Sequence, residues 1–269
     1  MAAVSFNAAG GGCGSCATEK SAREFFATLG VDPNFLDPVH DRCYCEDCYW
    51  PAPRWPDTIG NEGPTAYVVP RGWFRFGLSF GSEGRAKKHG IFKKWSASFH
   101  GVKSKTVLES ILDCGQLMKP GDRLLDGTKL RSTKCAGRQD EGFYTSPTVR
   151  YAGLKFYAEP QQFESAASGQ QMAGSIVLQC RQCPKSFTMQ GETMGFNTQW
   201  GRGHLAQSCQ HVPPGQLEWK SDVSPATIPC GLLSRVGETV ILLHPPLPLS
   251  GVSIRMERER QQNDSLANG

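Results

Sequence analysis

Residues 34 to 66 constrain the fold of this chain more than any other segment. They are rich in Cys, Pro, Trp and Asp, and they show neither the periodicity of a helix nor that of a strand. Such a segment must be ordered by something other than regular secondary structure. It contains the stretch VHDRCYCEDC, in which three cysteines follow one histidine within nine residues, 40 to 48.

Zinc explains how this segment could be ordered. The ion binds four nitrogen or sulfur donors in a tetrahedron, and the binding energy becomes folding energy. We therefore expect a structural Zn²⁺ site, closed by protein ligands, at His40, Cys43, Cys45 and Cys48. The pair Cys13 and Cys16 is an alternative source of ligands.

The composition predicts an intracellular protein, cytoplasmic or nuclear. The 269 residues include eleven cysteines, and the N-terminus has no secretory signal pattern, which favours reduced thiols or metal ligands over a disulfide framework. There is no run of about 18 apolar residues, so we expect no membrane span. A net charge of +4 is too small to indicate nucleic acid as a partner.

The periodic parts of the chain predict an α+β fold of short antiparallel strands. We expect one helix over 21–29, a second that starts with a capping box at Thr106 and Glu109 and ends at Gly115, and a third from Pro147 to about 158. The segment 67–80 is predicted as strand with a turn at 70–72. Further strands are expected over 95–100, 142–144, 175–181, 186–189, 217–219, 229–236 and 238–244.

Three residues that could take part in binding or catalysis lie at the ends of separate predicted strands. His100 ends one strand, Tyr144 ends a second, and Glu218 lies early in a third. Because strand ends open onto a common rim, the three side chains can converge on one cleft. A histidine can donate a hydrogen bond, a tyrosine offers a flat aromatic face, and a glutamate can stabilise a developing positive charge.

This order of motifs resembles a known family. A strand ending in His-Gly, a helix, the motif Gly-x-Tyr, a second helix and a late glutamate are similar to the catalytic domain of the poly(ADP-ribose) polymerase class of ADP-ribosyltransferases. The His-Tyr-Glu signature of that class would fall on His100, Tyr144 and Glu218, and "CGLLSRV" follows the glutamate at a matching interval. The resemblance covers about residues 95 to 245 and implies a split antiparallel β-sheet with two or more helices. More narrowly, "RCYCEDCYWP" and "VVPRGWFRFGL" are similar to the C-terminal region of a Neuralized-like protein, a region itself regarded as transferase-like.

The resemblance also implies roles for individual residues. NAD⁺ would be the substrate, with its ribose at His100 and its nicotinamide amide at the backbone of Gly101. Tyr144 would stack on the nicotinamide ring, and Glu218 would support transfer to a protein acceptor or to the chain itself. Family members place a serine in the helix after the tyrosine, whereas this chain has Tyr151-Ala152-Gly153; a second stacking ring could be Tyr151 or Tyr157, with Tyr151 favoured.

Two functions follow as expectations. The first is an NAD⁺-dependent ADP-ribosyltransferase, a glycosyltransferase that releases nicotinamide. The alternative is a catalytically inactive transferase-like binding or adaptor module. We expect four segments: a flexible N-terminus (1–20), a zinc-stabilised Cys-rich module (21–94), the transferase-like domain (95–250) and a charged C-terminal tail (251–269).

Overall fold

The protein has a mixed α+β fold, and all strand pairings among the described residues are antiparallel. The structure is a computed structural model, and it describes residues 16–49, 57–59, 66–79, 86, 88–131, 142–192 and 210–238. The N-terminal segment predicted as flexible over 1–20 is described only from residue 16, and its residues 17–20 belong to helix α1. The predicted tail at 251–269 and all but the first residue of the last predicted strand, 238–244, lie outside the described residues. No helix within the described ranges has the length and hydropathy to cross a membrane.

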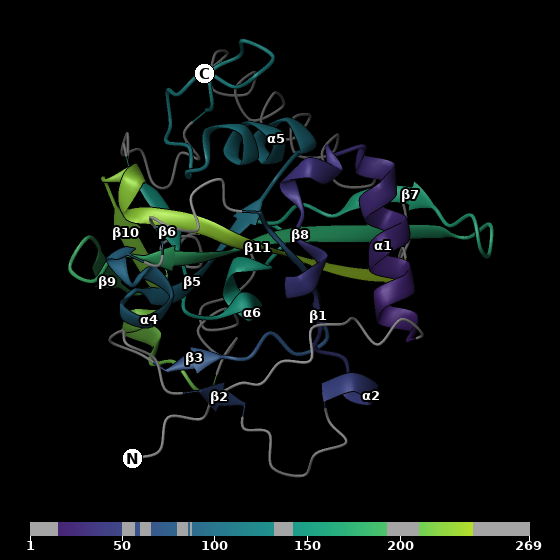
Figure 1. The fold of residues 1–269 in the computed structure, drawn as a ribbon, viewed down its shortest axis with the longest axis horizontal. Coiled ribbons are helices and arrows are strands. Elements are labelled where there is room, and N and C mark those ends of the chain that lie inside the picture. The colour runs from purple at the N-terminus through teal and green to yellow at the C-terminus, as the bar shows by residue number, and fades with distance from the viewer. Residues whose placement is uncertain are drawn as a thin grey trace, which may run out of the picture. The chain divides into compact units, whose positions relative to one another are not determined.

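The larger sheet is built around two strands of 12 residues each, β8 and β11. Its strand order is β1-β4-β11-β8-β5, and β7 pairs with the part of β8 that β5 leaves open. Its strands are β1 (Arg42–Cys43), β4 (Phe74–Gly77), β5 (Ser96–Val102), β7 (Gln161–Glu164), β8 (Gln171–Gln182) and β11 (Thr227–Glu238). Figure 1 shows β8 and β11 running side by side through the middle of the fold.

A smaller sheet of three strands has the order β6-β10-β9. It consists of β6 (Phe143–Thr145), β9 (Thr188–Gln190) and β10 (Glu218–Ser221). The two sheets meet where Phe99 of β5 exchanges backbone hydrogen bonds of 2.7 and 2.8 Å with Ser146, just after β6. A separate ribbon pairs β2 (Thr58–Ile59) with β3 (Tyr67–Val68). The antiparallel strands therefore form two sheets, and the boundary between these sheets lies between β5 and β6.

The helices are short and agree only partly with the sequence pattern. The α-helices are α1 (Ala17–Leu29), α2 (Glu46–Tyr49), α4 (Ile91–Lys94), α5 (Lys105–Cys114) and α6 (Val149–Ala152), and the 3₁₀ turns are η1 (Pro33–Phe35), η2 (Pro38–His40), η4 (Pro214–Gln216) and η5 (Ser224–Ala226). The expected capping box at Thr106 is wrong, because the N-cap of α5 is Ser104, whose Oγ accepts from the Val107 amide. The C-terminus predicted at Gly115 is confirmed, with a φ of 69°.

The helix expected from Pro147 to about 158 is also wrong in length. Only α6 forms, capped by the Thr148 hydroxyl, and the chain continues through turns to Ala158. The helix ends at Gly153, where a Cβ would lie 2.8 Å from the ring of Trp73. A glycine is a poor helix former, and here it is also the residue that lets the tryptophan approach. This early ending matters below, because it sets the position of Tyr157.

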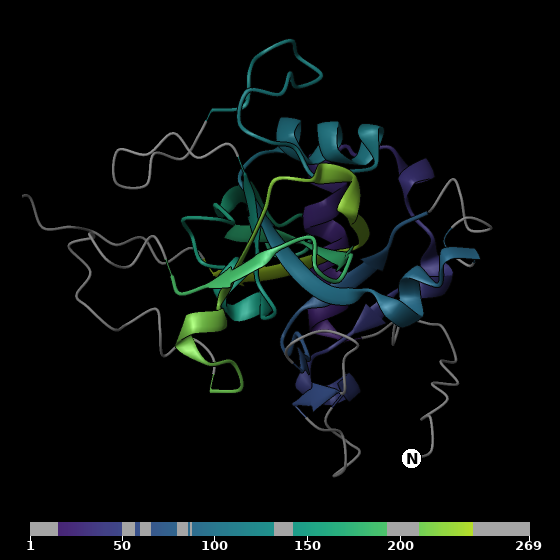
Figure 2. The same ribbon diagram turned by 90° about the vertical axis from the view of Figure 1, so that its left-hand side faces the viewer.

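Both faces of the larger sheet are buried. Ile176 and Leu178 of β8 lie in a core cluster with residues of α1 and α5, whereas Val177 between them lies in a second cluster with residues of α6. This alternation follows from the two-residue period of a strand. Figures 1 and 2 show α5 and α6 on opposite sides of the sheet.

Helix α1 is attached to the sheet by packing and by charge. The ring of Phe25 lies so close to Gly174 of β8 that a Cβ there would be 2.4 Å from it. Arg23 donates to the carboxylates of Glu19 and Asp41, each at 2.8 Å, and Asp41 also accepts from the Gly77 amide at 2.9 Å. The residues before 95 therefore share one sheet and one core with the residues after it.

Candidate functional site

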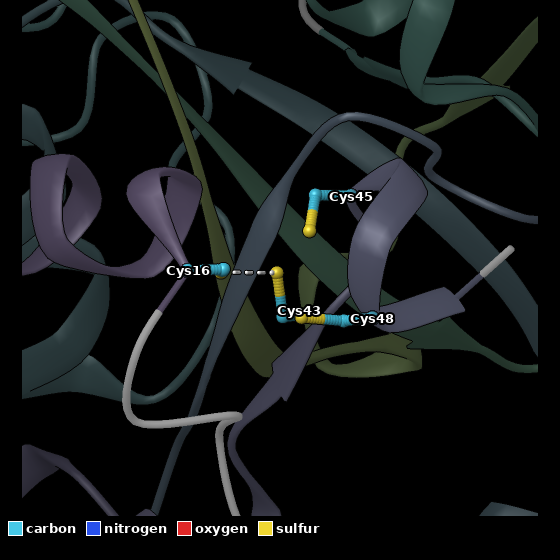
Figure 3. Close-up of side chains that lie close together, drawn as sticks. All are labelled: Cys16, Cys43, Cys45 and Cys48. Atoms are coloured by element: carbon cyan, nitrogen blue, oxygen red, sulfur yellow. Dashed lines mark hydrogen bonds between the residues drawn. The ribbon is translucent and has the colours of Figure 1, made fainter. Parts of the chain in front are cut away.

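Four cysteine sulfur atoms gather near the start of α1. Cys16 is the N-cap of α1, Cys43 ends β1, Cys45 precedes α2 and Cys48 lies within α2. Their sulfur atoms all lie within 4.8 Å of one another, and the Sγ atoms of Cys16 and Cys43 are 3.4 Å apart. Figure 3 shows the four side chains converging from these elements.

This cluster could hold a metal ion such as zinc. Four sulfur ligands at about 2.3 Å from a tetrahedral zinc ion are about 3.8 Å from one another, which the observed separations accommodate. The backbone amide of Glu19 donates to the sulfur of Cys16 at 3.3 Å, a contact that orients this thiol toward the other three. With four protein ligands, no position remains for a substrate, so the chemistry of the cluster is that of a structural site.

His40, the fourth ligand favoured from the sequence, is not in the cluster, and Cys16, from the alternative pair, is the fourth cysteine. His40 ends the short turn η2, its side chain is 60% exposed, and its Nε2 lies 3.6 Å from a carboxylate oxygen of Asp37. Asp37 caps this turn by accepting from the Val39 amide, and the His40 side chain is largely in solvent. Cys13, the other ligand considered from the sequence, lies outside the described residues.

The thiols of the cluster differ in acidity. Burial raises the pKa of the Cys43 thiol well above its ordinary value. Burial also acts on Cys45, but hydrogen bonds from the Cys48 amide and from neighbouring thiols outweigh it and lower its pKa. Among these two cysteines, Cys45 is therefore the one that ionises first.

A second group of polar side chains lies where the two sheets meet. His100 is in β5, and its Nδ1 lies 2.7 Å from the backbone oxygen of Tyr144 in β6. Because a carbonyl can only accept, Nδ1 carries the hydrogen, and Nε2 of the neutral ring keeps its lone pair. Burial lowers the pKa of His100 to about 4, so the ring is neutral at pH 7.

Strand register brings Tyr144 and Glu218 to one face of the smaller sheet. Tyr144 of β6 is paired with Lys220 of β10, and Glu218 lies two residues before Lys220. Directly paired residues share a face, and so do residues two apart along a strand. The structure thus places the His100 ring against the backbone of Tyr144, and it places the Tyr144 and Glu218 side chains on one face of the smaller sheet.

Glu218 accepts hydrogen bonds from three side chains although it is only 1% exposed. The hydroxyl of Tyr151 lies 2.6 Å from Oε1, and the hydroxyl of Tyr157 lies 2.9 Å from the same oxygen. The amide of Gln190 in β9 donates to Oε2 at 3.1 Å. Hydrogen bonds of this kind are what a buried carboxylate requires.

The two tyrosines after α6 have different environments. Tyr151, the favoured stacking ring in the sequence interpretation, is 2% exposed, so its ring faces are covered by protein. Burial raises the pKa of Tyr151, and the nearby Tyr157 and Glu218 raise it further, so the phenol stays protonated. Tyr157 is partly exposed, and its backbone packs against Gly101, where a Cβ would lie 2.6 Å from the Tyr157 carbonyl carbon. Of the two residues, Tyr157 is the more exposed.

Two residues near Glu218 were missed in the sequence. Gln190 is paired with Glu218 across β9 and β10, and Glu192 follows two residues later. Burial raises the pKa of Glu192, and the charge of Glu218 adds to this effect. Strand pairing identifies Gln190, and the raised pKa of Glu192 identifies the second residue; no local pattern in the sequence marks either of them.

A comparison with protein-family models finds no family that matches this chain.

Proposed function

We propose that this protein is an NAD⁺-dependent ADP-ribosyltransferase that breaks the bond between nicotinamide and ribose and transfers ADP-ribose to a protein acceptor. The observation that supports the proposal is the placement of His100, Tyr144 and Glu218 on adjoining strands, where the His100 ring is hydrogen-bonded at 2.7 Å to the backbone oxygen of Tyr144. The division of the antiparallel strands between β5 and β6 supports the same proposal, because the resemblance in sequence implies a split antiparallel sheet.

Each residue has a task that its surroundings allow. The Nε2 lone pair of neutral His100 accepts a hydrogen bond from a ribose hydroxyl. The ring of Tyr144, partly exposed, stacks on nicotinamide, and the backbone of Gly101 binds the carboxamide. As the glycosidic bond breaks, its electron pair leaves with neutral nicotinamide, and positive charge develops on the ribose. The carboxylate of Glu218 stabilises that charge.

Incubation of the purified protein with labelled NAD⁺ tests the proposal. We expect release of nicotinamide together with labelling of the chain or of an added acceptor. Glu218→Gln keeps the size of the side chain and removes its charge, so turnover should fall about 100-fold or more while NAD⁺ affinity changes little. The matched control is Glu164→Gln, the same substitution at an exposed position of β7, which should leave turnover unchanged. Equal turnover in both variants would remove Glu218 from the mechanism.

One observation favours the alternative, a catalytically inactive binding or adaptor module. Glu218 is almost inaccessible, and both of its oxygen atoms accept hydrogen bonds from protein side chains. A carboxylate enclosed in this way can serve to hold the pocket together. If the wild-type protein binds NAD⁺ or ADP-ribose and yet releases no nicotinamide with any acceptor, the adaptor function is the correct one.

For the cysteine cluster we propose Zn²⁺ as the bound ion, in a structural role. The protein should contain about one zinc per chain, and cobalt substitution should give the intense visible absorption of tetrahedral thiolate coordination. Cys16→Ser should lose the metal, whereas His40→Ala, which changes the ligand expected from the sequence, should retain it. Retention by the first variant and loss by the second would overturn the assignment.

A further inference from the structure

The three donors to Glu218 are not equivalent. Tyr151 is buried and makes the shortest contact, 2.6 Å, whereas Tyr157 is partly exposed and lies at 2.9 Å from the same oxygen. The two hydroxyl oxygens are also 2.9 Å apart. The two hydroxyl groups and Oε1 of Glu218 make three oxygen–oxygen contacts, but the two hydroxyl groups supply only two hydrogen atoms. At any moment, one of the three contacts is therefore not a hydrogen bond. Because the hydroxyl of Tyr151 is an alternative acceptor for Tyr157, Tyr157 can leave Glu218 without losing a partner.

The position of Tyr157 also matters. Its backbone lies against Gly101, and its hydroxyl reaches Glu218, so the residue spans the distance between the strand of His100 and the strand of the glutamate. Tyr157 is partly exposed, whereas Tyr151 is 2% exposed. Of the two tyrosines that donate to Glu218, Tyr157 is therefore the one in partial contact with solvent.

We propose that the hydroxyl of Tyr157 occupies the place at Glu218 Oε1 that a ribose hydroxyl takes when substrate binds, while Tyr151 and Gln190 hold the carboxylate in position. This inference rests on the function proposed above. Substrate exchanges one neutral O–H donor for another at the same oxygen. Glu218 is then never left without donors, which explains how a carboxylate that is 1% exposed can still act on a ligand.

The proposal gives the two tyrosines opposite roles, although their side chains are identical. Tyr151 and Gln190 are positioning residues, because they act on substrate only through Glu218. Tyr157 competes with substrate for the same hydrogen-bond acceptor. Loss of the Tyr151 hydroxyl should therefore impair the chemical step, and loss of the Tyr157 hydroxyl should make Oε1 easier for substrate to reach.

Steady-state kinetics of nicotinamide release test this difference in three variants of the full chain. Tyr151→Phe should lower kcat about tenfold or more with little change in KM, the scale of loss when a supporting residue is removed. Tyr157→Phe should instead lower KM by about fivefold, the equivalent of one neutral hydrogen bond. Tyr49→Phe, at a buried tyrosine of a different core cluster, is the control and should change neither constant. If Tyr157→Phe raises KM, or if both substitutions lower kcat alone, the exchange is refuted.

A second measurement separates failure of this inference from failure of the proposed function. Unfolding midpoints of Tyr151→Phe, Glu218→Gln and the double variant require no activity. Residues in direct contact give non-additive effects, so the double variant should lose less than the two single shifts together. If the shifts in unfolding midpoint are additive, Tyr151 does not hold the Glu218 carboxylate in position, even if the enzyme is active. If the shifts are non-additive but the protein neither releases nicotinamide nor binds NAD⁺, Tyr151 does hold Glu218 in position. The proposed function, and with it the hydroxyl exchange, would then be wrong.

Discussion

Acidification should lower the free energy of unfolding through His100, by an amount that follows from the lowered pKa of this residue. Burial lowers the pKa of this residue to about 4, from an ordinary value of 6.5. Between these two pH values the unfolded chain binds more protons than the folded chain, so stability falls as the pH falls. Each pKa unit corresponds to about 1.4 kcal/mol. The contribution of His100 is therefore fully present above pH 6.5, about 2 kcal/mol smaller at pH 5, and about 3 kcal/mol smaller at pH 4.

The assay compares urea unfolding of the wild type and of His100→Gln at several pH values from 7 to 4.5. Glutamine cannot titrate, so the difference in unfolding free energy between the two proteins isolates the histidine. Other groups that titrate in this range, including thiols that release a metal, contribute equally to both proteins and cancel. We expect the difference to change by about 2 kcal/mol in favour of the variant between pH 7 and pH 5. A difference that stays constant with pH would refute the burial of His100 against Tyr144.

Three further predictions concern the packing of the fold. Gly101→Ala should lower the free energy of unfolding by about 1–3 kcal/mol in urea titrations, because the new Cβ meets backbone atoms at 2.4 Å; an unchanged midpoint would contradict this close approach. Gly174→Ala should cost a similar amount, measured in the same way, by pushing Phe25 and helix α1 from the sheet; unchanged protection of α1 in hydrogen exchange would speak against it. Removal of the metal by a chelator should lower the thermal midpoint in one cooperative transition, seen equally by far-UV circular dichroism and by tryptophan fluorescence. Two separate transitions would instead indicate an independent Cys-rich module.

Elements with local signals could be predicted from the sequence. The turn at 70–72 between β3 and β4, the end of α1 at Leu29 and the end of α5 at Gly115 all follow from residues within a few positions of one another. The start of α1 at Ala17 was missed, since the helix was expected only from residue 21. Glycine at the end of a helix adopts the left-handed conformation that other residues avoid. Where two local signals competed, the sequence could not decide: Ser104 caps α5 rather than Thr106, because both residue types suit the position.

Features that depend on distant contacts could not be predicted. Cys16 and Cys43 are separated by 27 residues, and only the packing of α1 brings their sulfur atoms to 3.4 Å. The sequence offered Cys16 as an alternative ligand, but the spacing of VHDRCYCEDC favoured His40 because it is near in sequence. The donors to Glu218 were hidden for the same reason, since Gln190 reaches it only through the pairing of β9 with β10. The sequence placed His100 and Tyr144 at strand ends, but β5 continues to Val102 and β6 to Thr145, so both residues lie within their strands. The hydrogen bonds that enclose Glu218 left no signal in the sequence.

The two predicted modules share one sheet, and this has a consequence for the metal. The cysteine cluster links the start of α1 to β1, and the sheet continues from β1 through β4, β11 and β8 to β5, the strand of His100. Helix α1 covers the same core cluster to which β4, β8 and β11 contribute. Ordering energy supplied by a metal at the cluster is therefore shared along the sheet rather than confined to residues 34 to 66. The aperiodic segment that first indicated a metal is thus part of the framework that positions the candidate NAD⁺ site.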